Sequence, residues 1–118
     1  LATTSLMTLS SAGALAAIAS ITAYSDERLK TNWRDISSNF VAKLAQVKMG
    51  VYDRTDIKAT QVGVSAQSLR ELMPEAVLES EEGVLSVAYG NAALAAAIAL
   101  AKEVELLKQE IIELKKGK

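Results

Sequence analysis

The chain has 118 residues, with 13 Lys and Arg against 14 Asp and Glu and a net charge of −1 at pH 7. That length fits one domain at most, and the balanced charge gives no basic footprint for a nucleic-acid partner. Cysteine and histidine are both absent, which excludes disulfides, thiolate catalysis, Cys or His metal sites and a Ser-His-Asp hydrolase. Any acyl chemistry must therefore use Lys or a carboxylate as its base, and we expect no metal and no cofactor.

The apolar runs of the chain are too short to cross a membrane. Ala14–Ala19 has six residues and Ala92–Ala101 has ten, whereas a spanning helix needs about 20. Ala17-Ile18-Ala19 resembles a signal-peptidase site, but no positively charged segment precedes it, so we expect no signal peptide. Because the first residue is Leu1, we expect the chain to be the end of a longer polypeptide.

Residues 1–24 carry no charge, and every Lys, Arg, Asp and Glu lies in the 94 residues that follow. Thr8-Leu9, Ala14–Ala16 and Ser20–Tyr24 predict short strands, parted by the small-residue turn Ser10–Gly13. Such strands cannot form a core alone. We expect them to stack with the same strands of other chains, as in a fibre. The alternative is a disordered or Ala-rich helical leader.

Residues 34–47 predict a first helix, because apolar residues recur at helical spacing and Asp35, Ser37 or Ser38 can cap it. Two strand pairs and a second helix follow, and Pro74 ends that helix. The predicted strands are 51–52 with 61–64 and 77–78 with 84–87, the turns are 53–60 and 79–83, and the second helix is 65–73. We expect Trp33 and Tyr52 to be core residues rather than stacking platforms.

Residues 91–116 predict a long helix, which Asn91 can cap. Apolar residues recur at alternating spacings of three and four, which is a heptad pattern. Positions a are Ala97, Val104 and Ile111, and positions d are Leu100, Leu107 and Leu114.

The charges beside this seam agree with a parallel coiled coil, because Glu103 and Glu110 at g can pair with Lys108 and Lys115 at e of a neighbouring chain. Further apolar surface off the seam favours three strands over two; it comes from Ile98, Leu106 and Ile112. The alternative is an amphipathic helix folded back on its own domain.

Ser25 and Lys30 lie five residues apart, where the uncharged segment meets the charged one. A serine hydroxyl needs a base, and a lysine amine, with an unperturbed pKa of about 10.4, must be desolvated or placed near a cation to act as one. Arg28 could supply charge, and burial by neighbouring chains could supply more. The alternative is structural: Ser25 caps a helix whose first turn is acidic, and Lys30 lies in solvent.

The Ser25 hydroxyl could also attack the carbonyl carbon of Tyr24 through a five-membered ring. This N-to-O shift would convert the Tyr24–Ser25 amide into an ester, and water would then release residues 25–118. Such a reaction turns over once and gains from holding nucleophile and target in one chain.

The sequence resembles a known family in ITAYSDERLKTNW at 21–33, VGVSAQSLRELMPEAV at 62–77, GVLSVAYGNAALAAAI at 83–98 and the closing heptads. These stretches resemble the C-terminal intramolecular chaperone domains of bacteriophage tailspikes and tail fibres, which are self-cleaving serine peptidases. The same domain type occurs in myelin-regulatory-factor-type transcription factors. The resemblance covers essentially all of residues 25–116.

The resemblance implies an α+β domain that forms a homotrimer, assists folding of the upstream fibre segment of the same chains, and cuts itself off between Tyr24 and Ser25. The family's Ser-Lys dyad matches Ser25 and Lys30. The expected division is a fibre-like β end at 1–24, a globular chaperone and autoprotease domain at 25–90, and a trimeric coiled-coil helix at 91–118. No nucleic-acid or membrane partner is implied.

The implied location is the host cytoplasm during phage assembly, with the fibre itself in the virion tail and the chaperone released after cleavage. The main alternative is a non-catalytic trimerisation cap of a fibre protein. The transcription-factor version would need a membrane span after Lys118.

Overall fold

The computed structural model describes residues 5–117. The first four residues of the predicted fibre end 1–24, and the last residue of the predicted coil segment 91–118, lie outside the described residues. The chain divides into two compact units, residues 1–35 with 55–57 and residues 36–54 with 58–118.

The first unit contains one hairpin. Strands β1 (Met7–Leu9) and β2 (Leu15–Ala17) pair antiparallel, with Met7 opposite Ala17. Gly13 takes a φ of 86° in the connecting turn, a conformation that glycine adopts without steric cost. The strands predicted at 8–9 and 14–16 are thus present, but the strand predicted at 20–24 is not, since these residues pair with no strand in the described part of the chain.

The second unit contains the other two hairpins and three α-helices, the elements that the sequence predicts there. Strands β3 (Met49–Asp53) and β4 (Thr60–Val64) pair antiparallel, as do β5 (Val77–Glu79) and β6 (Leu85–Val87). Helix α2 (Ala66–Leu72) begins after Ser65, whose hydroxyl accepts a hydrogen bond from the Ser68 amide at 3.2 Å. The 3₁₀ turn η2 (Pro74–Ala76) follows α2. The expected α+β class is confirmed.

Helix α1 spans only Phe40–Leu44, so the predicted helix over 34–47 is wrong in its bounds. The cap position is Asn39, which makes no capping hydrogen bond with its side chain. Ser37, Ser38 and Asn39 offer the backbone competing hydrogen bonds and disfavour a helix interior, which explains the late start.

Helix α3 runs from Tyr89 to Lys116 and therefore begins two residues before the predicted cap Asn91, which lies inside the helix. The residue at the cap position is Ala88, which has no side-chain hydrogen bond to offer. Packing of the first turns rather than a local capping signal sets this start.

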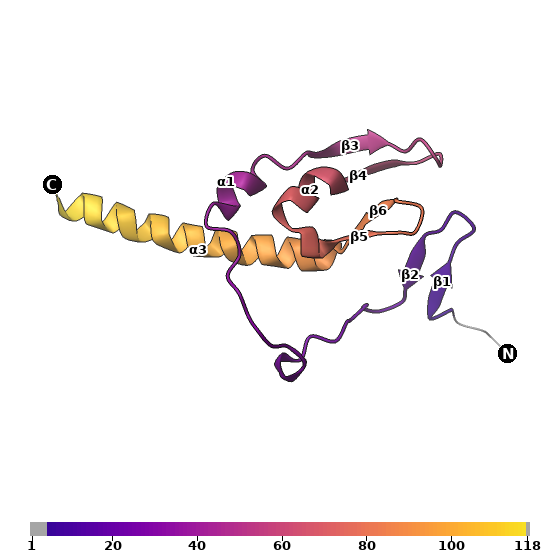
Figure 1. Ribbon diagram of the computed structural model, residues 1–118, viewed down its shortest axis with the longest axis horizontal. Helices are drawn as coiled ribbons and strands as arrows, with labels where there is room; N and C mark the ends of the chain where they lie inside the picture. Colours follow the sequence, from indigo (N-terminus) through magenta and orange to yellow (C-terminus); the bar gives the residue numbers. More distant parts are fainter. Residues whose placement is uncertain (1–4, 118) are drawn as a thin grey trace. The chain divides into compact units, whose positions relative to one another are not determined.

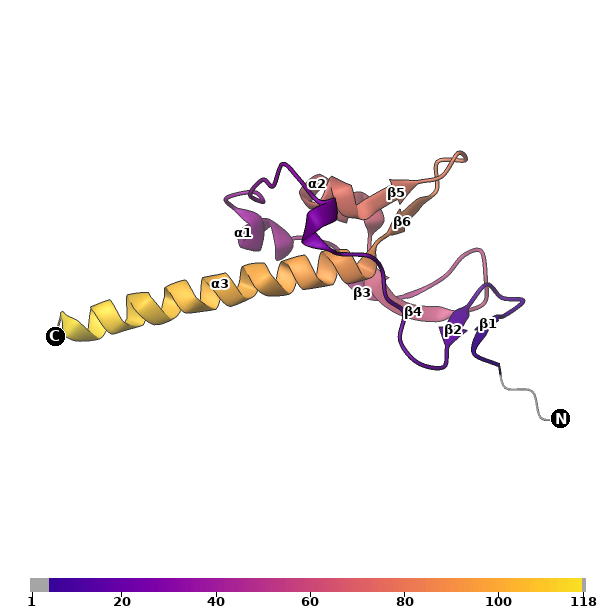
Figure 2. The same cartoon turned by 90° about the horizontal axis from the view of Figure 1, so that it is seen from below.

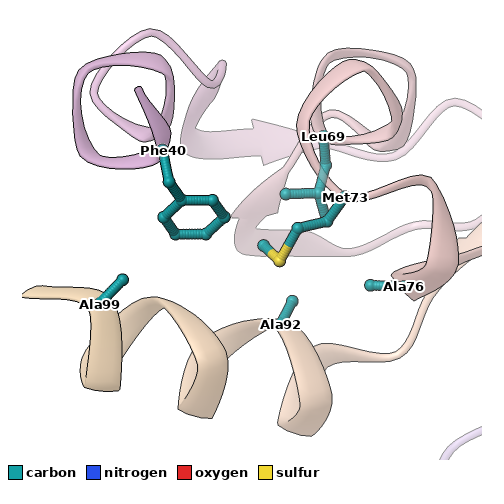
Figure 3. Packing of buried hydrophobic residues seen from close by; sticks show 6 residues of the cluster. All are labelled: Phe40, Leu69, Met73, Ala76, Ala92 and Ala99. Carbon is teal, nitrogen blue, oxygen red and sulfur yellow. The ribbon is translucent and has the colours of Figure 1, made fainter. Parts of the chain in front are cut away.

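The core of the second unit lies between α1, α2 and the first half of α3 (Figures 1, 2 and 3). Phe40 and Leu69 are each 3% exposed, and small residues on α3 let the other helices approach closely. The buried residues are Phe40, Leu69, Met73, Ala76, Ala92 and Ala99. In both ribbon views the second half of α3 continues beyond α1. No helix in the described part of the chain is long and apolar enough to span a membrane.

Candidate functional site

A short turn brings Ser25 and Lys30 together. The 3₁₀ helix η1 (Glu27–Leu29) closes through hydrogen bonds from the Leu29 amide to the Asp26 carbonyl and from the Lys30 amide to the Glu27 carbonyl, both 3.0 Å. After this reversal the Lys30 Nζ lies 2.6 Å from the Ser25 Oγ, and both residues are exposed. The pair that the sequence singled out is therefore in direct hydrogen-bond contact.

Asp26 and Arg28 hold this turn in shape. The Asp26 carboxylate accepts a hydrogen bond from the Arg28 amide at 2.9 Å and forms an ion pair with the Arg28 Nη2 at 2.7 Å. The Arg28 side chain lowers the pKa of Asp26, with a smaller contribution from the Arg28 amide, and the same contact raises the pKa of Arg28. Because Asp26 occupies the cap position, the alternative in which Ser25 caps the turn is wrong.

Trp33 also belongs to this site rather than to a core. Its side chain is 69% exposed, which corrects the expectation that it is buried, and Tyr52 is 37% exposed as well. The Lys30 ammonium lies 5.7 Å from the centre of the Trp33 ring, within the range of a cation–π contact. The Lys30 ammonium thus contacts both the Ser25 hydroxyl and the Trp33 ring.

The site is open to water in the single chain. No residue of η1 is buried, and large apolar side chains surround it without cover: Tyr24 is 95%, Ile21 73% and Leu29 72% exposed. A lysine acts as a base only where burial or a nearby cation favours its neutral form. The Arg28 guanidinium is paired with the Asp26 carboxylate at 2.7 Å.

The predicted coil seam is exposed along its length. Ala97 is exposed, although Ala92 and Ala99 on the neighbouring face of α3 are buried. The larger seam residues are 44% to 71% exposed, namely Leu100, Val104, Leu107, Ile111 and Leu114. The alternative in which this helix folds back on its own domain therefore fails for residues 100–117, all of which are exposed.

The sequence analysis did not predict the role of Asp26 in the turn or the contact of Trp33 with Lys30. The positioning role of Asp26 could have been found from an Asp placed two residues before an Arg at a turn, since Asp commonly caps such turns through a backbone amide. The contact of Trp33 with Lys30 had no clear signal, because an aromatic residue three positions away fits a core equally well. In residues 5–117 no group of acidic side chains gathers closely enough to hold a metal ion.

Comparison with known proteins places these residues in a family. Residues 25–78 match the family described as chaperone of endosialidase, and the match begins at Ser25. The chain therefore carries a domain of the chaperone of endosialidase family.

Curated relatives of this family domain are phage fibre proteins. The long tail fiber protein Gp37 of Enterobacteria phage M1 is 32% identical over 98 residues, and the protein of the same name from Enterobacteria phage Ox2 gives the same values. Each alignment covers 77% of this chain and 38% of the relative. The chain thus corresponds to well under half the length of these fibre proteins.

Proposed function

We propose that this chain is an intramolecular chaperone that trimerises through α3, assists folding of the upstream fibre segment of the same chains, and then releases itself by cutting between Tyr24 and Ser25. The observation that carries the proposal is the 2.6 Å contact between the Lys30 Nζ and the Ser25 Oγ. The family match, which begins at Ser25, supports the same cut.

In the proposed reaction, neutral Lys30 removes the proton of the Ser25 hydroxyl, and the oxygen attacks the carbonyl carbon of Tyr24. A C–O bond forms, the C–N bond breaks, and the proton passes to the Ser25 nitrogen, which leaves as an amine. Water then hydrolyses the ester and yields a Tyr24 carboxylate and a free Ser25 hydroxyl. Lys30 serves as the general base in both steps.

The exposed state of the single chain gives this reaction a switch. Ser25 and Lys30 meet water on this surface, and a neighbouring chain that covers them would favour the neutral amine. The exposed seam of α3 offers the route to that neighbour, through helices aligned in parallel with Glu103 and Glu110 facing Lys108 and Lys115. Cleavage would then follow assembly rather than precede it.

The proposed division of labour follows the chain. Residues 1–24 form the last strands of the fibre, 25–90 the chaperone and protease domain, and 91–118 the trimeric coil. The module would act in the host cytoplasm during assembly, and removal of the module would leave the fibre kinetically trapped in the virion tail.

A second candidate is a passive trimerisation cap of a fibre protein. The observation that favours it is the exposure of Ser25 and Lys30, because a hydrogen bond between two exposed side chains is an ordinary surface contact. Under this alternative α3 still associates, and the turn at Asp26 is only a connection.

Intact mass of the freshly expressed chain separates the two candidates. We expect fragments ending at Tyr24 and beginning at Ser25 in the unaltered chain, and full-length mass in Ser25→Ala and Lys30→Ala. Lys30→Arg is the matched control, because arginine retains the cation and the hydrogen bond but stays protonated. Full-length trimers in all four chains would instead establish the passive cap.

A further inference from the structure

The second unit has a cleft that has no role in the proposed reaction as described above. It measures about 670 Å³ and lies between the face of the β3–β4 hairpin, strand β6 and the first turn of α3. Tyr52, Gln61, Gly63, Ser86 and Tyr89 are among the residues that line it.

Gly63 lets two tyrosine hydroxyls lie over the wall of this cleft. A methyl group at position 63 would come within 2.7 Å of the Tyr89 hydroxyl and 3.0 Å of the Tyr52 hydroxyl. These distances are below ordinary van der Waals contact, so any side chain there would displace the tyrosines. The absence of a side chain at Gly63 therefore matters for the shape of the cleft, and not for a turn conformation of the backbone.

Strand β6 presents a free edge to the cleft. The Ala88 amide donates to the Ala76 carbonyl and the Ser80 amide to the Val84 carbonyl, so even-numbered residues of this strand turn their backbone groups toward β5. Antiparallel strands alternate, and the backbone groups of Leu85 and Val87 therefore point outward. In the described part of the chain, β5 is the sheet neighbour of β6.

This edge also lacks the usual protection against a further strand. Strands β3 and β5 end in the charged residues Asp53 and Glu79, whereas Leu85–Val87, like β4, has no charge. Unprotected edges recruit extended peptides, with main-chain hydrogen bonds supplying affinity and neighbouring pockets supplying selectivity.

The segment before the scissile bond has the matching properties. Residues 20–24 are uncharged, belong to neither helix nor strand, and are exposed throughout. Cleavage requires that this segment be held in a fixed geometry. In a parallel trimer the heptad charges align the copies, so that the first turns of α3, where Tyr89 lies, gather at one end.

We propose that the cleft of one copy binds residues 20–24 of a second copy as an added strand on β6, and so holds the bond that is cut. This inference rests on the proposed function. It assigns the cleft as the substrate-binding surface and makes the neighbouring chain contribute to each site.

Disulfide trapping tests the docking without requiring cleavage, because the chain has no cysteine of its own. In a Ser25→Ala background, isotope-labelled chains with Ser86→Cys are mixed with unlabelled chains carrying a cysteine in the docked segment. The backbone groups of Ser86 point toward β5, so Ser86 and the residue opposite it on an added strand would form a non-hydrogen-bonded pair. The Cα atoms of such a pair lie about 4.5 Å apart, which suits a disulfide. Because the pairing register between the docked segment and β6 is not specified, Ile21→Cys, Thr22→Cys and Ala23→Cys are tested in turn.

We expect a labelled–unlabelled disulfide with Ser86→Cys and none with Glu82→Cys, the control in the exposed turn of the same hairpin. Failure of all three segment cysteines to react with Ser86→Cys overturns the inference. In a chain that carries Ser86→Cys and the segment cysteine together, disulfides that close only within one chain overturn it too, since they place the segment on its own cleft.

Cleavage kinetics give an independent test in the otherwise unaltered chain. Gly63→Ala should slow the cut by about tenfold to a hundredfold through misplacement of the bound segment, with trimerisation and melting temperature retained. Gly90→Ala is the control, because a methyl group there meets no other atom within 4 Å. Equal rates for the two variants overturn the inference and leave the proposed cut standing, whereas an unaltered chain that never cuts refutes the proposed function and leaves the disulfide test to decide the docking.

Discussion

Placing two aspartates in the seam of α3 should abolish association without unfolding the chain. Val104 and Ile111 are 50% and 51% exposed, and neither touches the core of its own domain. Covering the exposed half of a Val or Ile side chain stabilises by about 1 kcal/mol, so the six side chains in a trimer contribute about 6 kcal/mol. That corresponds to roughly 10⁴ in the association constant, before the cost of burying the carboxylates is added.

Sedimentation of Val104→Asp with Ile111→Asp, beside the unaltered chain, measures this loss. The matched control is Lys102→Gln with Gln109→Asp, which changes the net charge by the same amount on a face away from the seam. We expect trimers in the unaltered and control chains and monomers in the seam variant, with a folded second unit throughout. Trimers that survive both aspartates would refute the assignment of this seam as the interface.

The remaining predictions concern the core and the turn. Phe40→Ala should lower the free energy of unfolding by about 3–5 kcal/mol, while Val62→Ala at a 74% exposed position should change it little, as thermal melting would show. Asp26→Ala should slow cleavage by releasing Arg28 and the turn, whereas Glu27→Ala should not; equal rates would argue against a positioning role for Asp26. Because the pKa of Asp26 is lowered, its carboxylate should stay charged, and the ion pair intact, as the pH falls through the range in which an ordinary Asp is protonated. The ion pair should be lost only when the pH falls through the lowered pKa, which the NMR shifts of the carboxyl group would follow.

The parts of the fold that follow from local chemistry could be predicted from the sequence. Ser65 caps α2 as its hydroxyl allows, and Pro74 stops that helix. Both hairpins of the second unit lie where apolar runs flank polar turns. The helix over 91–116 was predicted because its apolar residues follow helix periodicity, and α3 spans Tyr89–Lys116.

The parts that depend on tertiary contact could not. The start of α3 at Tyr89 has no capping side chain that could predict it. The late start of α1 at Phe40 follows instead from the polar residues just before it. The exposure of Trp33 depends on the surface available in one chain. The contact between Ser25 and Lys30 is local instead, and the spacing of five residues did not by itself specify the 3₁₀ turn that brings the two side chains to 2.6 Å.

The proposed function explains the open site and the exposed seam together. Under it, a single chain keeps Ser25 and Lys30 in water and the α3 seam uncovered, and assembly would remove water from both. This coupling would prevent a chain from losing its chaperone before the fibre has formed.

The measurement that tests this coupling most directly is the rate of cleavage per chain as a function of protein concentration, with the oligomeric state recorded in the same samples. The account predicts that the rate rises with the trimer fraction and reaches a plateau when every chain is assembled, and that the Val104→Asp, Ile111→Asp variant stays uncut at every concentration. A constant rate across the transition, or monomers that cut as fast as trimers, would contradict activation of Lys30 by assembly.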